Sequence, residues 1–67
     1  MNNIPHPIIT DKIVSQVMDI RSSGAVNMLD ATGVQIEANK QGFYELVILI
    51  EEHRKAYSSF ILTGERQ

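Results

Sequence analysis

The sequence predicts an all-α fold: a small bundle of three to four helices with a long C-terminal helix, completed by self-association. Three observations lead to this prediction. Apolar residues recur at helical spacing after residue 10, a run from Phe43 to Leu62 contains neither Gly nor Pro, and Gly residues follow the predicted helix ends. A chain of 67 residues forms one domain at most. We expect an arm at residues 1–9 and a single helical domain at residues 10–65.

The first nine residues are predicted to form an extended N-terminal arm. Pro5 and Pro7 favour extended backbone for themselves and for the residues before them. Ile4, Ile8 and Ile9 are apolar enough to lie against another surface. We therefore count the arm among the segments that can contact a partner.

A first helix is predicted from about residue 10 to residue 23. Thr10 is a favourable N-cap, Asp11 complements the positive end of the helix dipole, and Gly24 is a natural stop. The apolar stripe of this helix consists of Ile13, Val14, Val17 and Met18. The residues expected on its solvent side are Asp11, Lys12, Ser15, Gln16 and Asp19.

The middle of the chain predicts a second helix. Asp30 or Thr32 is a suitable N-cap, Val34 and its neighbours continue the helix, and Gly42 ends it. Gly33 inside this helix indicates a close backbone approach or a break.

A β-hairpin is the alternative for residues 34–50. Residues 34–38 alternate between apolar and polar, and residues 39–42 have the composition of a turn. We favour the helix because Ala, Glu, Gln and Lys are good helix formers, and because an isolated two-stranded hairpin is at best marginally stable. The hairpin stays open as the alternative.

The last third of the chain predicts one helix of about 20 residues, about 30 Å long. Its predicted core face consists of Phe43, Leu46, Leu49, Ile50, His53, Ala56, Tyr57, Phe60 and Ile61. Residues 43–50 hold seven apolar side chains among eight, so they are apolar on all sides. Such a helix is normally buried all round, and monomers rarely expose a large apolar patch. We therefore predict self-association, as a homodimer or higher oligomer, through Phe43, Tyr44, Val47 and Ile48.

Composition excludes several classes of site. The chain has no Cys, so it forms no disulfide and lacks the ligands of most structural zinc sites. The only cluster with chemistry-like residues is Glu51, Glu52 and His53, and a zinc helix of the HExxH kind needs a second His. We expect His53 to pack in the core. The sequence predicts no enzyme, no cofactor and no metal.

Charge and hydropathy limit the partners. The net charge is −2, and Arg54 with Lys55 is separated from Glu51 and Glu52 by His53 alone, so no basic patch of the kind that binds nucleic acid is indicated. No signal peptide is evident, and the apolar runs are far shorter than the ~20 residues of a membrane span. We expect a cytoplasmic protein with neither nucleic acid nor membrane as its partner.

The segment from Ile20 to Glu65 resembles a family of small uncharacterised proteins of phages, prophages and other mobile elements of Firmicutes. In that family stretches like NMFD, GFYELV, EEHKKEY and FILTGE follow one another. The matching stretches here are Asn27–Asp30, Gly42–Val47, Glu51–Arg54 and Phe60–Gly64, with Leu29 in place of an aromatic residue. The resemblance implies a mobile-element origin and a compact helical domain. It implies no reaction and no site.

The resulting functional hypothesis is a homo-oligomeric interaction module. We expect it to bind and modulate, by inhibition, a host or phage protein in the host cytoplasm. Tyr57 and Arg54 are the predicted contact residues, because aromatic residues and Arg are enriched at protein interfaces. The alternative is a small DNA-binding transcriptional regulator, whose recognition helix would start at Gly42 and would be apolar where such helices are polar and basic.

Overall fold

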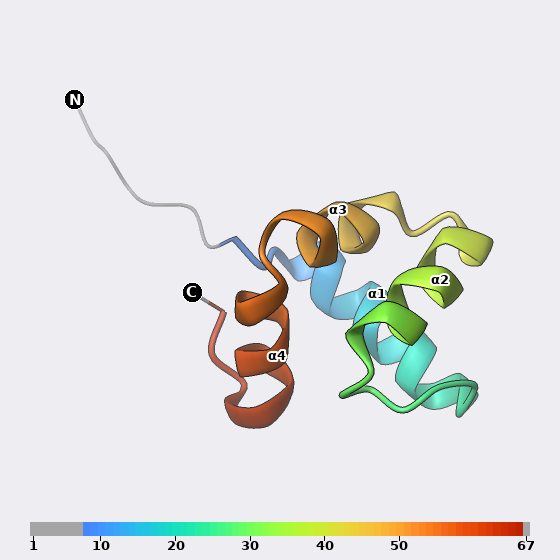
Figure 1. Ribbon diagram of the computed structural model, residues 1–67, viewed down its shortest axis with the longest axis horizontal. Helices are drawn as coiled ribbons and strands as arrows, with labels where there is room; N and C mark the ends of the chain where they lie inside the picture. Colours follow the sequence, from blue (N-terminus) through green and yellow to red (C-terminus); the bar gives the residue numbers. More distant parts are fainter. Residues whose placement is uncertain (1–7, 67) are drawn as a thin grey trace.

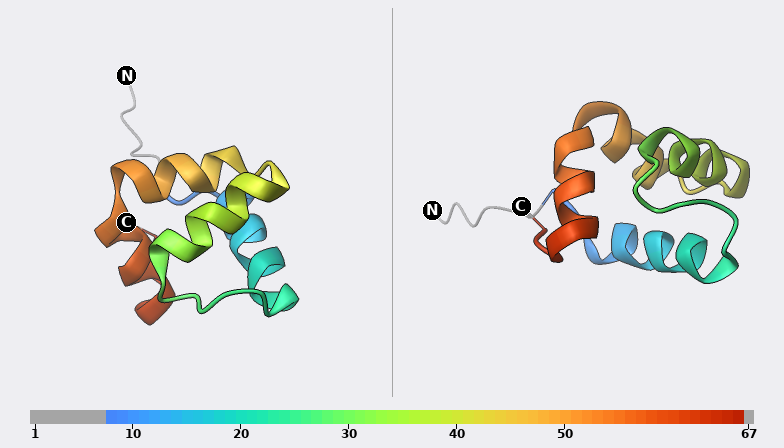
Figure 2. Two further views of the ribbon diagram at one scale, coloured as in Figure 1. Left: turned by 45° about the vertical axis from the view of Figure 1, so that its right-hand side comes forward. Right: turned by 60° about the horizontal axis from the view of Figure 1, so that its bottom comes forward.

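Four α-helices make up the fold of residues 8–66, which are the residues that the computed structural model describes. They are α1 (Asp11–Ser23), α2 (Ala31–Gln41), α3 (Tyr44–Glu52) and α4 (Arg54–Thr63). Helix α3 contacts each of the other three helices, and α4 lies at one end of the bundle (Figures 1 and 2). The predicted all-α class is confirmed. The described residues contain no strand, so residues 34–50 form helices and the hairpin alternative is wrong.

Helix α1 begins and ends where the sequence predicts. The Ile13 backbone N–H donates to Thr10 Oγ1 at 3.2 Å, and Gly24 ends the helix with φ 68°, a left-handed conformation that costs glycine little. The buried side of α1 consists of Ile13, Gln16, Val17 and Ile20. Met18, predicted on the apolar stripe, is exposed instead, because it lies about 100° around the helix from Val17.

Helix α2 confirms the predicted second helix. The Asp30 side chain caps it by accepting a hydrogen bond from the Gly33 backbone N–H at 3.1 Å, and Gly42 ends it with φ 76°. A Cβ at Gly33 would lie 2.5 Å from Asp30 Oδ2, so this glycine marks a close approach between its backbone and the capping carboxylate. Ala31, Val34 and Ala38 form the buried side of α2.

The predicted long C-terminal helix is wrong, because the chain breaks it at His53. His53 adopts φ −141° and ψ 55°, which lies outside the helical region, and the chain turns there from α3 into α4. The turn returns Ala56 and Tyr57 to the core, and Phe60 packs against it. One straight helix would have carried these side chains away from α1 and α2, so burial of apolar surface favours the break. His53 itself is exposed, contrary to its predicted place in the core.

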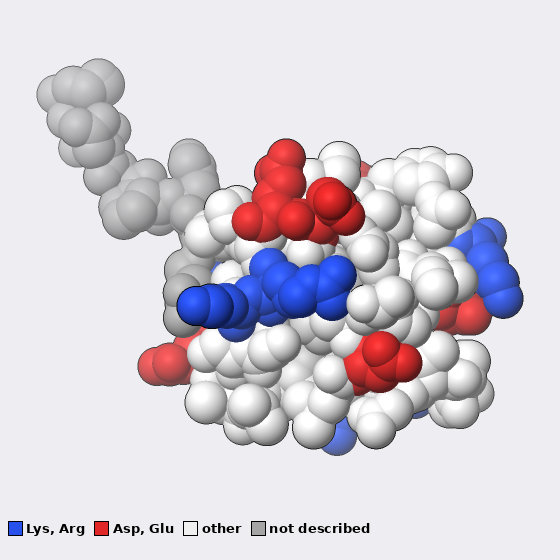
Figure 3. Space-filling model, viewed as in Figure 1, with Lys and Arg blue, Asp and Glu red and all other residues white. Residues whose placement is uncertain are grey.

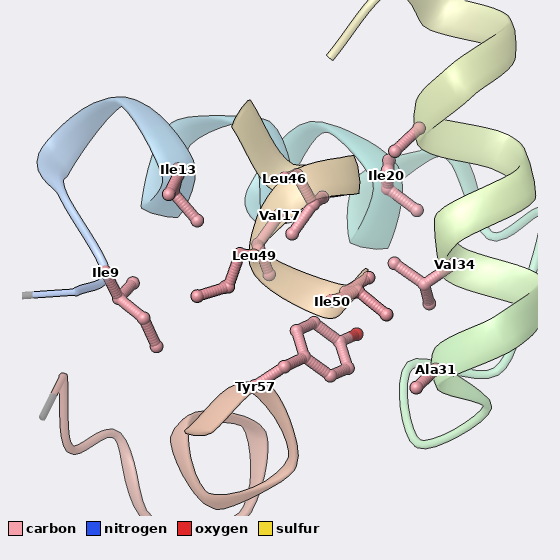
Figure 4. Close-up of a cluster of buried hydrophobic side chains, with 11 residues drawn as sticks. Ile9, Ile13, Val17, Ile20, Ala31, Val34, Leu46, Leu49, Ile50 and Tyr57 are labelled. Atoms are coloured by element: carbon pink, nitrogen blue, oxygen red, sulfur yellow. The ribbon is translucent and has the colours of Figure 1, made fainter. Parts of the chain in front are cut away.

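The core lies between α1, α2, α3 and α4 (Figure 4). Its buried side chains are Ile9, Ile13, Val17, Ile20, Ala31, Val34, Ala38, Leu46, Leu49, Ile50 and Tyr57. The ring of Tyr57 points from α4 toward Ile50, and it is one of the largest fully buried side chains. Leu46, Leu49 and Ile50 are buried as predicted.

The two ends of the described chain meet beside α1. Ile9 is buried in the core, and its N–H donates to the Arg66 carbonyl oxygen at 3.4 Å. The Arg66 guanidinium also forms an ion pair with Asp11 at 2.5 Å between Nη1 and Oδ1. Of the predicted arm, Ile8 and Ile9 are described, and residues 1–7 lie outside the described residues.

Candidate protein-binding surface

Helix α3 is held in place by a side chain from α1. Phe43 provides no side-chain cap for α3, and the Leu46 N–H in its first turn donates instead to Gln16 Oε1 at 3.2 Å. Gln16 Nε2 donates to Glu45 Oε1 at 2.9 Å. The Gln16 amide therefore serves two groups in the first turn of α3, in a place where backbone N–H groups need partners from outside the helix.

The first turn of α3 also holds a stabilised carboxylate. Glu45 accepts the Gln16 hydrogen bond and pairs with Lys12, whose Nζ lies 3.1 Å from Glu45 Oε2. The Gln16 amide, the backbone N–H of Glu45 and the Lys12 ammonium lower the pKa of Glu45 from 4.5 to about 2. Glu45 is therefore ionised at any physiological pH, and it places a fixed negative charge on the outer side of α3.

Helix α2 fixes the opposite side of α3. Gln35 Nε2 donates to the Val47 carbonyl oxygen at 3.1 Å and to Glu51 Oε1 at 3.0 Å. Together with the Gln16 contacts, these bonds support the rotation of α3 about its own axis that the burial of Leu46, Leu49 and Ile50 favours. The side of α3 opposite these three residues therefore points outward.

Tyr44 and Ile48 are the apolar side chains that α3 turns outward. They are 60% and 54% exposed, and they lie one helical turn apart on the same side. Phe43 and Val47, the other two predicted self-association residues, are half-buried and pack against the chain's own core. The fold thus covers most of the apolar run at residues 43–50 and leaves two of the four predicted residues on the surface.

An open groove of about 290 Å³ runs beside Ile48. Its apolar lining consists of Ile8, Ile13, Ile48 and Leu49, and its polar lining consists of Glu45, Glu52 and His53. Residues from the start of the described chain, from α1 and from α3 meet here. We define these seven residues, together with Tyr44, as the α3 surface.

Tyr57, a predicted contact residue, is buried and cannot contact a partner. Its hydroxyl donates to the Met28 carbonyl oxygen at 2.7 Å and so attaches the segment between α1 and α2 to α4. Burial, together with the negative charge of Asp30, raises the pKa of Tyr57 from 10.0 to about 12. The helical pattern also placed Tyr57 on the predicted core face, and its burial agrees with that placement.

Arg54, the other predicted contact residue, lies on the surface. Its Nη1 donates to Thr32 Oγ1 at 3.2 Å, which joins the start of α4 to the start of α2. Lys and Arg side chains form a band over the start of α4, and Asp and Glu side chains gather over the end of α3 next to it (Figure 3). Arg54 therefore lies in a region of mixed charge.

Gln16, which holds α3 in place, and several residues of the α3 surface were not predicted as site residues from the sequence. Gln16 was assigned to the solvent side of the first helix, yet it is only 6% exposed. Its position, three residues after Ile13 and four before Ile20, places it on the apolar stripe and is a signal that could have found it. No local signal joins Ile8 or Glu52 to this surface, because the groove forms only when three separate segments meet.

Other exposed apolar side chains are distributed over the rest of the molecule. They are Met18 on α1, Leu29 before α2, Ile36 on α2 and Leu62 on α4. Single exposed apolar residues are ordinary features of protein surfaces. The α3 surface differs from them because two exposed residues share one side of a helix beside a groove.

Two further findings concern metals and membranes. No three or more His, Cys, Asp or Glu side chains of residues 8–66 lie where they could hold a metal ion together. In the same part of the chain, none of the helices has the length and apolar character needed to cross a membrane.

Comparison with known proteins places the chain in one family. No curated protein and no solved structure is detectably similar to it. A family model described as "Domain of unknown function (DUF5049)" matches residues 9–65. This match includes all four helices and begins at the buried Ile9. The chain therefore belongs to the DUF5049 family of domains.

Proposed function

We propose that this protein acts by binding another protein through the α3 surface and that binding modulates, in the simplest case inhibits, that partner. The observation that supports the proposal is the exposure of Tyr44 and Ile48 beside the groove. Exposed apolar groups on one helical face are a common feature of protein-interaction sites. Tyr is also among the residues that most often dominate binding energy at interfaces.

The partner we propose is a protein of the host cell or of the phage. This part of the proposal rests on the resemblance of Ile20–Glu65 to proteins of phages and other mobile elements. We do not extend the proposal to DNA, since the outward side of α3 carries Glu45 and Glu52. Negative charges there would repel the phosphate backbone, which supplies most of the affinity in non-specific DNA binding.

Self-association is a separate part of the proposal, and the fold makes it less necessary. The sequence suggested it because residues 43–50 are apolar on all sides, yet α1, α2 and α4 cover Leu46, Leu49 and Ile50. Light scattering on the wild type and on Ile48→Glu tests this part. A dimer that the substitution dissociates would assign the α3 surface to a second copy, whereas a folded monomer would remove self-association from the proposal.

Capture of a partner by matched variants tests the binding function. Ile48→Glu and Ile36→Glu introduce the same change at two exposed isoleucines, 54% and 56% exposed, on different helices. We expect a partner retained by the wild type and by Ile36→Glu to be lost with Ile48→Glu. Equal retention by both variants would show that the α3 surface is not the binding site.

A further inference from the structure

We infer that the α3 surface binds a basic amphipathic segment of its partner, with apolar side chains in the groove and Lys or Arg side chains beside its acidic rim. This inference rests on the proposed binding function and specifies the chemistry of the partner. Three features support it: the apolar lining of the groove, the charges at its edge, and the approach of like charges that binding of a second copy would require.

The lining of the groove is suited to aliphatic side chains. Ile13 and Leu49 are nearly buried and form its deeper part, and Ile8 and Ile48 are exposed at its edges. Its volume of about 290 Å³ lies just below the range of about 300–1,000 Å³ typical of small-molecule sites. An open groove of this size fits one face of a protein segment better than it fits an enclosed cofactor.

The rim of the groove is acidic. Glu45 is ionised, but Lys12 Nζ pairs with it at 3.1 Å, so much of the charge that Glu45 would offer to a partner is offset. Among residues 8–66, Glu52 forms no side-chain hydrogen bond or ion pair with another residue. Acidic side chains gather over the end of α3, next to the band of Lys and Arg over the start of α4 (Figure 3). A partner segment with Lys or Arg beside its apolar residues is complementary to this charge.

A second copy of the chain is a poorer occupant of the same surface. A two-fold axis near Ile48, perpendicular to α3, would place the two α3 helices antiparallel. Glu45 of each copy would then approach Glu52 of the other copy, because Glu45 lies three residues before Ile48 and Glu52 lies four residues after it. Like charges in contact disfavour an interface, so the rim selects a basic partner over the chain itself.

Two synthetic peptides test the inference on the full chain. Each is a helical peptide of about 14 residues, or four turns, with Leu along one side. In one peptide all the remaining positions are Lys, and in the second they are all Glu. The dissociation constants are measured by fluorescence anisotropy, and the bound site is mapped by NMR shifts of the protein. We expect the Leu/Lys peptide to bind at least about tenfold more tightly and to shift Ile8, Ile13 and Ile48.

Charge reversal distinguishes complementarity from simple apolar adhesion. Glu52→Lys should lower the affinity for the Leu/Lys peptide about fivefold, because one exposed attraction becomes a repulsion of similar size. It should raise the affinity for the Leu/Glu peptide. Asp19→Lys also replaces an exposed acidic residue by Lys, at a position of α1 that does not line the groove, and should leave both affinities unchanged. Ile48→Glu should abolish binding of the Leu/Lys peptide while Ile36→Glu preserves it.

Four results would overturn the inference. They are equal affinity for the two peptides, shifts centred outside the groove, a wild-type dimer that Ile48→Glu dissociates, and NMR contacts between Ile4 and Ile48 that place the chain's own N-terminal segment in the groove. The proposed binding function is separable from these results. A natural partner that is lost with Ile48→Glu but contacts the groove through a neutral or acidic segment would refute the inference alone.

Discussion

Substitution of Gln16 by Leu should destabilise the protein through helix α3. Leu keeps most of the side-chain volume in a site that is only 6% exposed, but it removes both amide hydrogen bonds. The Leu46 N–H then lies buried without its acceptor. An unsatisfied buried donor costs about 1–3 kcal/mol. The solvent-exposed Glu45 carboxylate can exchange its lost partner for water and is not included in this cost.

The expected loss of about 2 kcal/mol corresponds to a decrease of roughly 10 °C in melting temperature for a domain of this size. Thermal and urea unfolding, followed by far-UV circular dichroism, measures it. Gln41→Leu is the matched control, because Gln41 Nε2 donates to Glu37 Oε2 at 2.8 Å on the exposed side of α2. We expect that change to stay within about 0.5 kcal/mol of the wild type.

Amide hydrogen exchange at Leu46 locates the effect. Gln16→Leu should increase exchange in the first turn of α3 more than in α2. Equal stability of the Gln16→Leu and Gln41→Leu proteins would refute the reasoning, because it would mean that the amide from α1 does not hold α3 in place.

Three further predictions follow from the same structure. Tyr57→Phe should cost about 1 kcal/mol in urea unfolding, because it removes the hydrogen bond to Met28, whereas Tyr44→Phe on the surface should be neutral. The pKa of Glu45 is lowered to about 2, so its contribution to stability is present above about pH 4.5 and is lost as the pH falls toward 2. Glu45→Gln should therefore reduce the dependence of the unfolding free energy on pH across that range. An unchanged pH dependence would contradict the assignment. Gly33→Ala should destabilise the wild type, because the new Cβ displaces the capping carboxylate of Asp30. In an Asp30→Ala protein the same change should be stabilising, because Ala is a better helix former than Gly and there is no cap to disturb. A double-mutant cycle with no coupling between the two positions would exclude this contact.

The α3 surface was predicted only in part. The sequence identified Tyr44 and Ile48 as apolar residues without internal partners, and both are exposed. It also selected Phe43 and Val47, which are half-buried, because periodicity alone does not show how far α1 and α2 cover a neighbouring helix. The groove combines Ile8, α1 and α3, so its lining could not be read from any one segment.

The sequence by itself determined the helical class and the ends of the first two helices, since Thr10, Asp30, Gly24 and Gly42 act on their own backbone neighbours. Only the tertiary structure decided the break at His53 and the direction of α4 after it. No Gly or Pro marks that break, because its stabilisation comes from the apolar surface that α4 buries after the chain turns. Capping side chains and glycines determine where a helix starts and stops when they act on neighbouring backbone groups. Packing decides the direction of a helix and which of its sides remains on the surface.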